Sequence, residues 1–353
     1  MRTAALALLL ATGSTAGCGG AATPAAPTAP SPAPPTVLAW RWRNLTPASS
    51  LAPEPRAHGV AVYDAAGRRL VVFGGQGERA LLDDTWAFDL ASSTWSQLDT
   101  RGGPPEPRLG ADAVYDPVAR RLVLWAGQAG SRFFDDTWAL DLRTLEWRDL
   151  SPESRPQARY GSASIFDPVQ RRLVQFAGFT DLSRRFRDTQ AFDLAVHRWE
   201  DLTPPEGGPR VRCLLTAALH APSRRMIVYG GQNNGFLDDL WAFDLAARTW
   251  SDLTTQSRPA GRLLASSFVD REGRFVVFGG RTELGQVNET WTFDLARGEW
   301  SLLAVTERPP ERDSAMTAYV EAEERFLVFG GNGARRMNDV WELSRVAVPA
   351  MAR

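Results

Sequence analysis

Hydrophobic and polar positions alternate in short runs along most of the chain, and similar runs recur at a regular interval. Residues 84–90 read DTWAFDL, residues 136–142 read DTWALDL and residues 239–245 read DLWAFDL. Because successive side chains of a strand point to opposite faces, Trp86 and Phe88 are predicted to share one buried face. Runs rich in β-branched and aromatic residues, bounded by Asp, Ser and Gly, predict strands.

Each repeat contains four such runs. In the first repeat they are AHGVAVYD (57–64), RRLVVFGG (68–75), DTWAFDL (84–90) and STWSQLD (93–99). The turns between the runs are short, which predicts that the four strands pair as an antiparallel meander.

Two landmarks give the period of the repeat. A pair of small residues ends the second run, at positions 74–75, 126–127, 177–178, 230–231, 279–280 and 330–331. A tryptophan marks the fourth run at Trp95, Trp147, Trp199, Trp250 and Trp300, in steps of 52, 52, 51 and 50 residues. Six units of four strands with a period near 50 predict an all-β fold, a six-bladed β-propeller.

The sixth repeat lacks a fourth run, because its third run ends at Leu343 and no further tryptophan follows. A run that fits stands before the first repeat, AWRWRNLTP at 39–47, in which Trp42 and Leu45 have the spacing of Trp95 and Leu98. We therefore predict that the N-terminal strand completes the last blade and closes the ring, which leaves only short strand edges.

These landmarks resemble those of the kelch-repeat family, over residues 38–346. The shared features are the small pair, an aromatic residue in the third strand and the tryptophan in the fourth. The resemblance implies a kelch-type propeller with four antiparallel strands per blade. The sequence departs from the family pattern in two ways. Ala126 and Ala177 replace the first glycine of the pair. In the third strand, where the family usually has tyrosine, five blades have tryptophan and blade three has Gln190.

The two ends of the chain read differently from the repeats. Residues 1–17 combine Arg2 with an apolar run and predict a secretory signal peptide. Residues 15–18, Thr-Ala-Gly-Cys, resemble a bacterial lipobox, which implies that Cys18 becomes lipid-modified; plain secretion is the alternative. Residues 18–37 are rich in Pro and Ala and predict an extended tether, and residues 347–353 form a short tail. This organisation predicts a protein secreted across the inner membrane and anchored as a lipoprotein, at the outer membrane or the cell surface.

One arginine stands where the first strand of each blade begins. The six are Arg56, Arg108, Arg159, Arg212, Arg262 and Arg312. Two interpretations are open: the guanidinium groups pair with the recurring acidic turns, such as Asp84 and Asp136, and brace the blades, or several of them face the mouth of the ring and bind an acidic ligand. We expect Arg108 and Arg159 to face the mouth, because a glycine two residues later leaves room beside each.

Blade three contributes further arginines, Arg184, Arg185 and Arg187, in the loop after its second strand. They predict a basic rim on that side of the ring. The acidic turns themselves recur in every blade and are predicted to be structural, because Asp side chains bond to nearby backbone N–H groups.

Composition adds little to this reading. The net charge of −1 gives no indication of a nucleic-acid partner. The three histidines, His58, His197 and His220, are scattered over the repeats, which argues against the copper-oxidase arrangement found among kelch-like enzymes. Cys213 lies in a strand-like run and is expected to be a buried, unreactive thiol. No catalytic set, cofactor or metal site is predicted.

The function that fits best is an extracytoplasmic, monomeric propeller that binds a protein or glycan, with acidic ligands matching the arginines. A carbohydrate-active kelch enzyme, such as a sugar mutarotase or epimerase, is an alternative, because it needs only a carboxylate and arginines in a pocket. A purely structural component of the envelope is the third reading.

Overall fold

The structure, a computed structural model, describes residues 36–48, 51–181, 184–305 and 307–349. Within it Leu38–Val348 form one compact unit. The predicted signal peptide, Cys18 and nearly all of the predicted tether lie outside the described residues. No helix in the described part of the chain has the length and apolar character needed to span a membrane.

Six antiparallel sheets of four strands, the blades, follow one another along the chain. Blade 1 contains β2 (Val60–Asp64), β3 (Arg69–Gln76), β4 (Leu81–Asp89) and β5 (Thr94–Leu98). Blade 2 contains β6 (Asp112–Asp116), β7 (Arg121–Trp125), β10 (Thr137–Asp141) and β11 (Glu146–Asp149), with the short pair β8 (Gln128–Ala129) and β9 (Arg132–Phe133) between β7 and β10. Blade 3 contains β12 (Ala163–Asp167), β13 (Arg172–Phe176), β14 (Thr189–Asp193) and β15 (Arg198–Asp201).

The second half of the ring has the same plan. Blade 4 contains β16 (Thr216–His220), the 3-10 turn η1 (Ala221–Ser223), β17 (Arg225–Tyr229), β18 (Leu240–Asp244) and β19 (Thr249–Asp252). Blade 5 contains β20 (Ser266–Val269), β21 (Arg274–Phe278), β24 (Thr290–Asp294) and β25 (Glu299–Leu302), with β22 (Arg281–Thr282) and β23 (Gly285–Gln286) in one loop. Blade 6 contains β26 (Met316–Val320), the turn η2 (Glu321–Glu323), β27 (Arg325–Asn332), β28 (Arg336–Pro349) and β1 (Thr36–Asn44).

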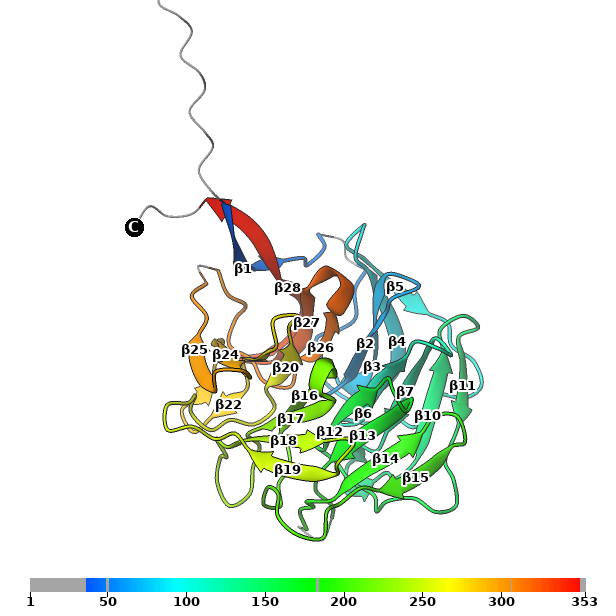
Figure 1. Cartoon of the computed structure of the whole chain (residues 1–353). Coiled ribbons are helices and arrows are strands. Elements are labelled where there is room, and N and C mark those ends of the chain that lie inside the picture. Colours follow the sequence, from blue (N-terminus) through cyan, green and yellow to red (C-terminus); the bar gives the residue numbers. More distant parts are fainter. Residues whose placement is uncertain (1–35, 49–50, 182–183, 306, 350–353) are drawn as a thin grey trace, which may run out of the picture. The chain divides into compact units, whose positions relative to one another are not determined.

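The first strands of the blades contact one another in a circle, from β2 through β6, β12, β16 and β20 to β26 and back to β2. They are therefore the innermost strands and surround the axis of the ring (Figure 1). This confirms the predicted six-bladed, all-β propeller.

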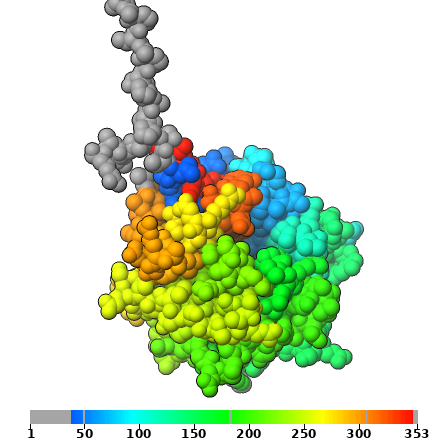
Figure 2. Space-filling model, in the orientation of Figure 1, coloured from blue at the N-terminus to red at the C-terminus, as the bar shows by residue number. Residues whose placement is uncertain are grey.

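The ring is closed as predicted, because β1 adds to β28 as the fourth strand of blade 6. The Leu45 backbone N–H donates to the Val340 carbonyl at 2.8 Å. The ring of Trp42 lies 4.5 Å from that of Phe278 in blade 5, and its indole N–H donates to Thr290 at 3.3 Å. The first and last coloured segments of the chain accordingly lie side by side (Figure 2).

The fourth-strand tryptophans explain the period of the sequence, because each packs against an aromatic residue in the second strand of the preceding blade. Trp147 lies 4.8 Å from Phe73, and Trp250 lies 4.6 Å from Phe176, between ring centroids. Corresponding pairs occur at the other four junctions, namely Trp95 with Phe329, Trp199 with Trp125, Trp300 with Tyr229 and Trp42 with Phe278. Tilted aromatic pairs of this kind stabilise beyond the area they bury.

The antiparallel order gives the ring two unlike faces. The loops that join strands two and three, and those that join strand four to the next blade, lie together on what we call the loop face. The turns that join strands one and two, and strands three and four, lie on the opposite side, which we call the turn face. The mouth is the opening of the ring axis on the loop face.

Candidate functional site

The six arginines at the starts of the first strands lie at the loop face, but their side chains are buried, with exposed fractions between 0% and 2%. Each guanidinium bonds to the recurring acidic residue of its own blade, which lies two residues before the third-strand tryptophan or Gln190. Arg56 donates to both carboxylate oxygens of Asp84, at 2.5 and 2.8 Å. The other pairs are Arg108 with Asp136, Arg159 with Asp188, Arg212 with Asp239, Arg262 with Glu289 and Arg312 with Asp339.

The remaining donors of each guanidinium are also used inside the blade. In blade 2, Nη1 of Arg108 donates to the carbonyl of Ala126 at 3.0 Å, and Nε donates to the carbonyl of Glu106 at 3.0 Å. The first is a carbonyl of the small pair that ends the second strand, so the arginine ties three segments of the blade together. Equivalent bonds to the small pair occur in all six blades.

The acidic residue of each turn also accepts a hydrogen bond from the side chain two residues later, which explains the recurring Asp-Thr-Trp and similar motifs. The indole N–H of Trp86 donates to Asp84 at 2.7 Å, and that of Trp138 donates to Asp136 at 2.8 Å. In blade 3 the amide of Gln190 makes the same bond, to Asp188 at 3.2 Å. Gln190 therefore replaces the aromatic residue but still provides an N–H donor to the aspartate.

The carboxylates of Asp84 and Asp239 have lowered pKa values. Burial alone would raise the pKa of Asp84, but the hydrogen bonds and charge of Arg56, with the indole of Trp86, hold that pKa below its ordinary value. The pKa of Asp239 is lowered in the same way, with burial opposed by the hydrogen bonds and charge of Arg212.

The expectation that Arg108 and Arg159 face the mouth is wrong. Both guanidiniums are ion-paired inside their blades and lie over aromatic rings, Arg108 at 3.8 Å from Phe134 and Arg159 at 4.1 Å from Phe186. The contacts of all six arginines agree with the bracing interpretation.

The glycines that follow Arg108 and Arg159 do not leave room beside them. A Cβ on Gly110 would lie 2.0 Å from the ring of Tyr160, and one on Gly161 would lie 2.7 Å from Leu214. The backbone at this position is left-handed in every blade, including non-glycine residues such as His58 at a φ of 58°. Glycine is favoured at 110 and 161 because φ is positive there and because a neighbouring side chain leaves no space for a Cβ.

These left-handed residues form a closed circle of backbone hydrogen bonds around the mouth. Each N–H donates to the carbonyl of the equivalent residue in the preceding blade, for example Gly110 to His58 at 2.8 Å and Leu214 to Gly161 at 2.6 Å. The circle runs through His58, Gly110, Gly161, Leu214, Leu264 and Ser314 and returns to His58. A side-chain pattern cannot reveal this feature, because only main-chain atoms take part.

The mouth itself is lined by polar and aromatic residues that follow the arginines and the small pairs. The backbone of Tyr160 forms an antiparallel bridge with that of Phe179 in blade 3, and Cys213 forms the equivalent bridge with Gln232 in blade 4. Asp313 accepts hydrogen bonds from Ser314 at 2.8 Å and from Gln286 at 3.1 Å.

The thiol and imidazole groups near the mouth are disfavoured in their charged forms. Cys213 is buried, as predicted, and burial raises the pKa of its thiol. Burial likewise lowers the pKa of His58. His197 and His220 lie on the turn face. No group of three or more potential metal ligands occurs among the described residues.

One carboxyl group links two inner strands. Asp112, at the start of β6, accepts hydrogen bonds from Ser162 at 2.5 Å and Ser164 at 3.0 Å, both in blade 3. Burial raises the pKa of Asp112 to about 6, because the hydroxyls and the more distant Arg159 offset only part of the lost hydration. The sequence analysis did not single out this residue.

The loop between strands two and three of blade 3 carries arginines of a different kind. Among the described residues Arg184, Arg185 and Arg187 have no carboxylate partner within salt-bridge distance, and Arg184 and Arg187 are exposed. Arg184 lies 5.5 Å from the ring of Phe186, and Arg185 lies 5.7 Å from that of Phe179. These three residues, which we call the rim arginines, agree with the basic rim expected on this side.

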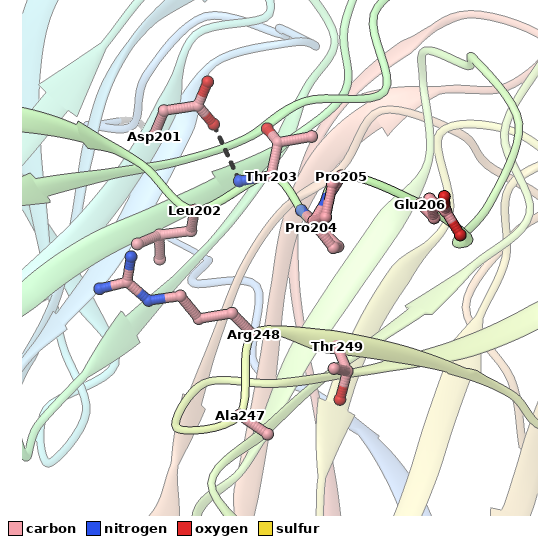
Figure 3. A pocket seen from close by; sticks show the side chains of 9 residues that line it. All are labelled: Asp201, Leu202, Thr203, Pro204, Pro205, Glu206, Ala247, Arg248 and Thr249. Carbon is pink, nitrogen blue, oxygen red and sulfur yellow. Dashed lines mark hydrogen bonds between the residues drawn. The ribbon is translucent and has the colours of Figure 1, made fainter.

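Pockets in the described part of the chain open at the surface away from the ring axis. One of about 430 Å³ lies at the outer wall between blades 3 and 4, beside Asp201, Pro204, Pro205, Glu206 and Arg248 (Figure 3). Two of its polar side chains have partners, because Arg248 pairs with Glu200 at 2.6 Å and Asp201 accepts the Thr203 N–H at 2.8 Å. Another, of about 400 Å³, lies on the loop face across blades 6 and 1 and includes Glu311 and Arg335.

The family model of the KLHDC2/KLHL20/DRC7 Kelch-repeats domain matches residues 36–221, 117–271 and 208–347. The chain belongs to the kelch-repeat family. Its relatives include proteins of very different size. This kelch propeller is 26% identical over 261 residues to the host cell factor homolog hcf-1 of Caenorhabditis elegans, covering 67% of this chain and 33% of that protein.

Two further relatives match smaller shares. The flagellar outer-arm dynein alpha chain of Chlamydomonas reinhardtii is 24% identical over 227 residues, 60% of this chain and 5% of that protein. The acyl-CoA-binding domain-containing protein 5 of Arabidopsis thaliana is 38% identical over 114 residues, 31% of this chain and 17% of that protein. The chain thus spans no more than a third of the length of these relatives.

Proposed function

We propose that this kelch propeller binds an acidic protein partner through its loop face, while its N-terminal segment holds it at the cell envelope. The observation that carries the proposal is the state of the rim arginines, whose charges no described carboxylate offsets. An unpaired guanidinium offers a fork of donors to a carboxylate and a flat face to an aromatic ring. Arginine and aromatic residues are also enriched at protein interfaces.

The contrast with the six bracing arginines supports this assignment. The bracing arginines are buried and use their donors within one blade, so they have little left to offer a ligand. Of the rim arginines, Arg184 lies beside Phe186 and Arg185 beside Phe179, and none of the three has a carboxylate partner among the described residues. The loop face thus divides its arginines between those that build the blades and those free to bind.

The envelope location rests on sequence features outside the described residues. The resemblance of residues 15–18 to a lipobox and the Pro- and Ala-rich character of residues 18–37 support a lipid-anchored, tethered protein. The wild-type protein should partition into the detergent phase, and Cys18→Ser should not. Wild-type protein recovered free in the medium, with an N-terminus other than residue 18, would reject the anchor.

The binding proposal is tested by affinity capture from solubilised envelope proteins, with quantitative mass spectrometry. The bait is the chain from residue 19, as wild type or with Arg184, Arg185 and Arg187 all changed to Gln. The matched control changes three exposed turn-face arginines, Arg198, Arg225 and Arg297, to Gln.

We expect the rim variant to lose partners that the wild type and the control retain, and we expect added salt to weaken that retention because exposed charges are screened. If the rim variant retains the same proteins in the same yield as the wild type, the loop-face assignment is wrong.

A further inference from the structure

The turn face carries an excess of positive charge that arises from the way its buried carboxylates are paired. Asp64 is fully buried and contacts two arginines, Arg69 of its own blade at 3.1 Å and Arg120 of the next blade at 2.9 Å. The arrangement recurs in blades 2 and 3, with Asp116 between Arg121 and Arg171 and Asp167 between Arg172 and Arg224. Each of these aspartates carries one negative charge for two guanidiniums, and Arg172 also contacts Glu200 at 3.5 Å.

The excess is confined to one part of the ring. The turns between strands one and two in blades 1 to 4, residues 64–69, 116–121, 167–172 and 220–225, contain eight arginines and three aspartates, an excess of five positive charges. The equivalent turns of blades 5 and 6, residues 270–274 and 320–325, contain three arginines and five acidic residues. The turns between strands three and four in blades 1 to 4, residues 89–94, 141–146, 193–198 and 244–249, add three arginines and five acidic residues, so the excess there falls to three positive charges. The turn face is therefore basic over blades 1 to 4 and acidic over blades 5 and 6.

Exposed valines stand on turns of blades 2 and 3, Val118 and Val169 between strands one and two and Val196 between strands three and four. Val118, Val169 and Val196 are 70%, 64% and 66% exposed, and they are three of the seven large hydrophobic residues exposed in the described part of the chain. Their turns touch, because Arg171 donates to Asp116 at 2.8 Å and Arg121 donates to the Leu194 carbonyl at 2.6 Å. We call Val118, Val169 and Val196 the valine patch.

The chain also enters and leaves the propeller on this face. The fourth strand of every blade runs from the turn face to the loop face, and β1 is the fourth strand of blade 6. Leu38 therefore lies at the turn-face end of β1, and Val348, near the end of the antiparallel β28, lies at the same end. Strands β1 and β28 lie side by side (Figure 1). Leu38, the residue that follows the predicted tether in the sequence, thus lies on the face that bears the valine patch.

We propose that the turn face rests on an anionic membrane surface, with the valine patch in the headgroup region and the surrounding arginines near lipid phosphates. Arginines near an anionic leaflet each contribute about 1 kcal/mol, and apolar side chains add to this as they leave water. Separate tips on short turns, without a groove, suit a flat surface. The loop face and its rim arginines would then point away from the membrane.

The inference shares its envelope location with the proposed function but uses other residues, so the two can fail separately. Residues 36–349 form the closed ring described above and can be tested without any lipid anchor. The assay is co-sedimentation with vesicles of phosphatidylcholine alone or with about 30 mol% phosphatidylglycerol, because the anionic lipid supplies the surface potential.

We expect binding to the anionic vesicles only, and loss of that binding in about 0.5 M salt. Changing Val118, Val169 and Val196 together to Ser should lower the partition coefficient at least about tenfold. Changing Arg198 and Arg225 to Gln should lower it about fivefold for each arginine, which is the factor that corresponds to about 1 kcal/mol. The matched loop-face controls, Leu284→Ser and the pair Arg281→Gln with Arg335→Gln, should bind as the wild type does.

Several results would overturn this inference. Equal sedimentation with both kinds of vesicle would show that the basic turns do not bind preferentially to an anionic surface. Equal losses in the loop-face controls would show that the turn face is not the contact. Self-association without vesicles, abolished by the valine changes, would assign this surface to a second copy of the chain, whose acidic blades 5 and 6 complement the basic turns.

Discussion

The bracing role of the arginine ring predicts a graded loss of stability when its acidic partners are removed. Changing Asp136 to Ala leaves Arg108 charged in a site where only 2% of the residue is exposed, with two of its hydrogen bonds gone. Breaking a buried pair in this way costs about 3–5 kcal/mol. Because the Asp136 side chain is 22% exposed and water can replace part of it, we expect about 2–4 kcal/mol.

Blade 5 supplies an internal comparison. Arg262 makes a single hydrogen bond to Glu289, at 3.0 Å, and the Glu289 side chain is 38% exposed. Changing Glu289 to Ala should therefore lower the free energy of unfolding by only about 1–2 kcal/mol. The surface control is Asp135→Ala, next to Asp136 in sequence, whose pair with Arg155 is exposed at both partners and should contribute less than about 1 kcal/mol.

The measurement is urea unfolding followed by tryptophan fluorescence, with the free energy taken from midpoints at an unchanged slope. The expected order of destabilisation is Asp136→Ala, then Glu289→Ala, then Asp135→Ala. If Asp136→Ala unfolds at the midpoint of Asp135→Ala, the guanidinium of Arg108 does not depend on its carboxylate, and the bracing argument fails.

Three further predictions follow from the fold. Gly110→Ala should lower the unfolding free energy by about 2–4 kcal/mol in urea, because its Cβ meets the ring of Tyr160 and φ is positive; wild-type stability would contradict this. Folding raises the pKa of Asp112 from 3.8 to about 6, so its contribution is complete below pH 4 and is lost as the pH rises through 6. The wild type should therefore lose about 1–3 kcal/mol more unfolding free energy between pH 4 and pH 6 than Asp112→Asn does, measured from urea midpoints at these two pH values. An equal loss in both proteins would refute this prediction. Deleting residues 36–47 removes the buried Trp40, Trp42 and Leu45 and should cost at least about 5 kcal/mol, seen in thermal melting; a deletion protein melting like the intact propeller would refute the closure argument.

Much of the fold could be predicted because its determinants are local and repeated. The alternation around Trp86 and Phe88 places these two side chains on one face of a strand. The ring buries the opposite face as well, since Thr85 and Ala87 are 1% and 2% exposed. Six copies at one period leave a ring as the arrangement in which every blade covers its neighbour. Even the closure by the N-terminal strand was visible, because Trp42 and Leu45 have the spacing of a missing fourth strand.

The tertiary structure decided which arginines pair with a carboxylate and which have none among the described residues, because the partners are distant in the sequence. Arg108 meets a carboxylate 28 residues further on, whereas Arg120 meets Asp64 of the preceding blade, 56 residues away. Glycine at 110 seemed to offer space, but the ring of Tyr160 from the next blade fills it. The period of the sequence sets how many blades there are, while contacts between blades set the direction of each side chain, because those contacts exist only once the ring has closed.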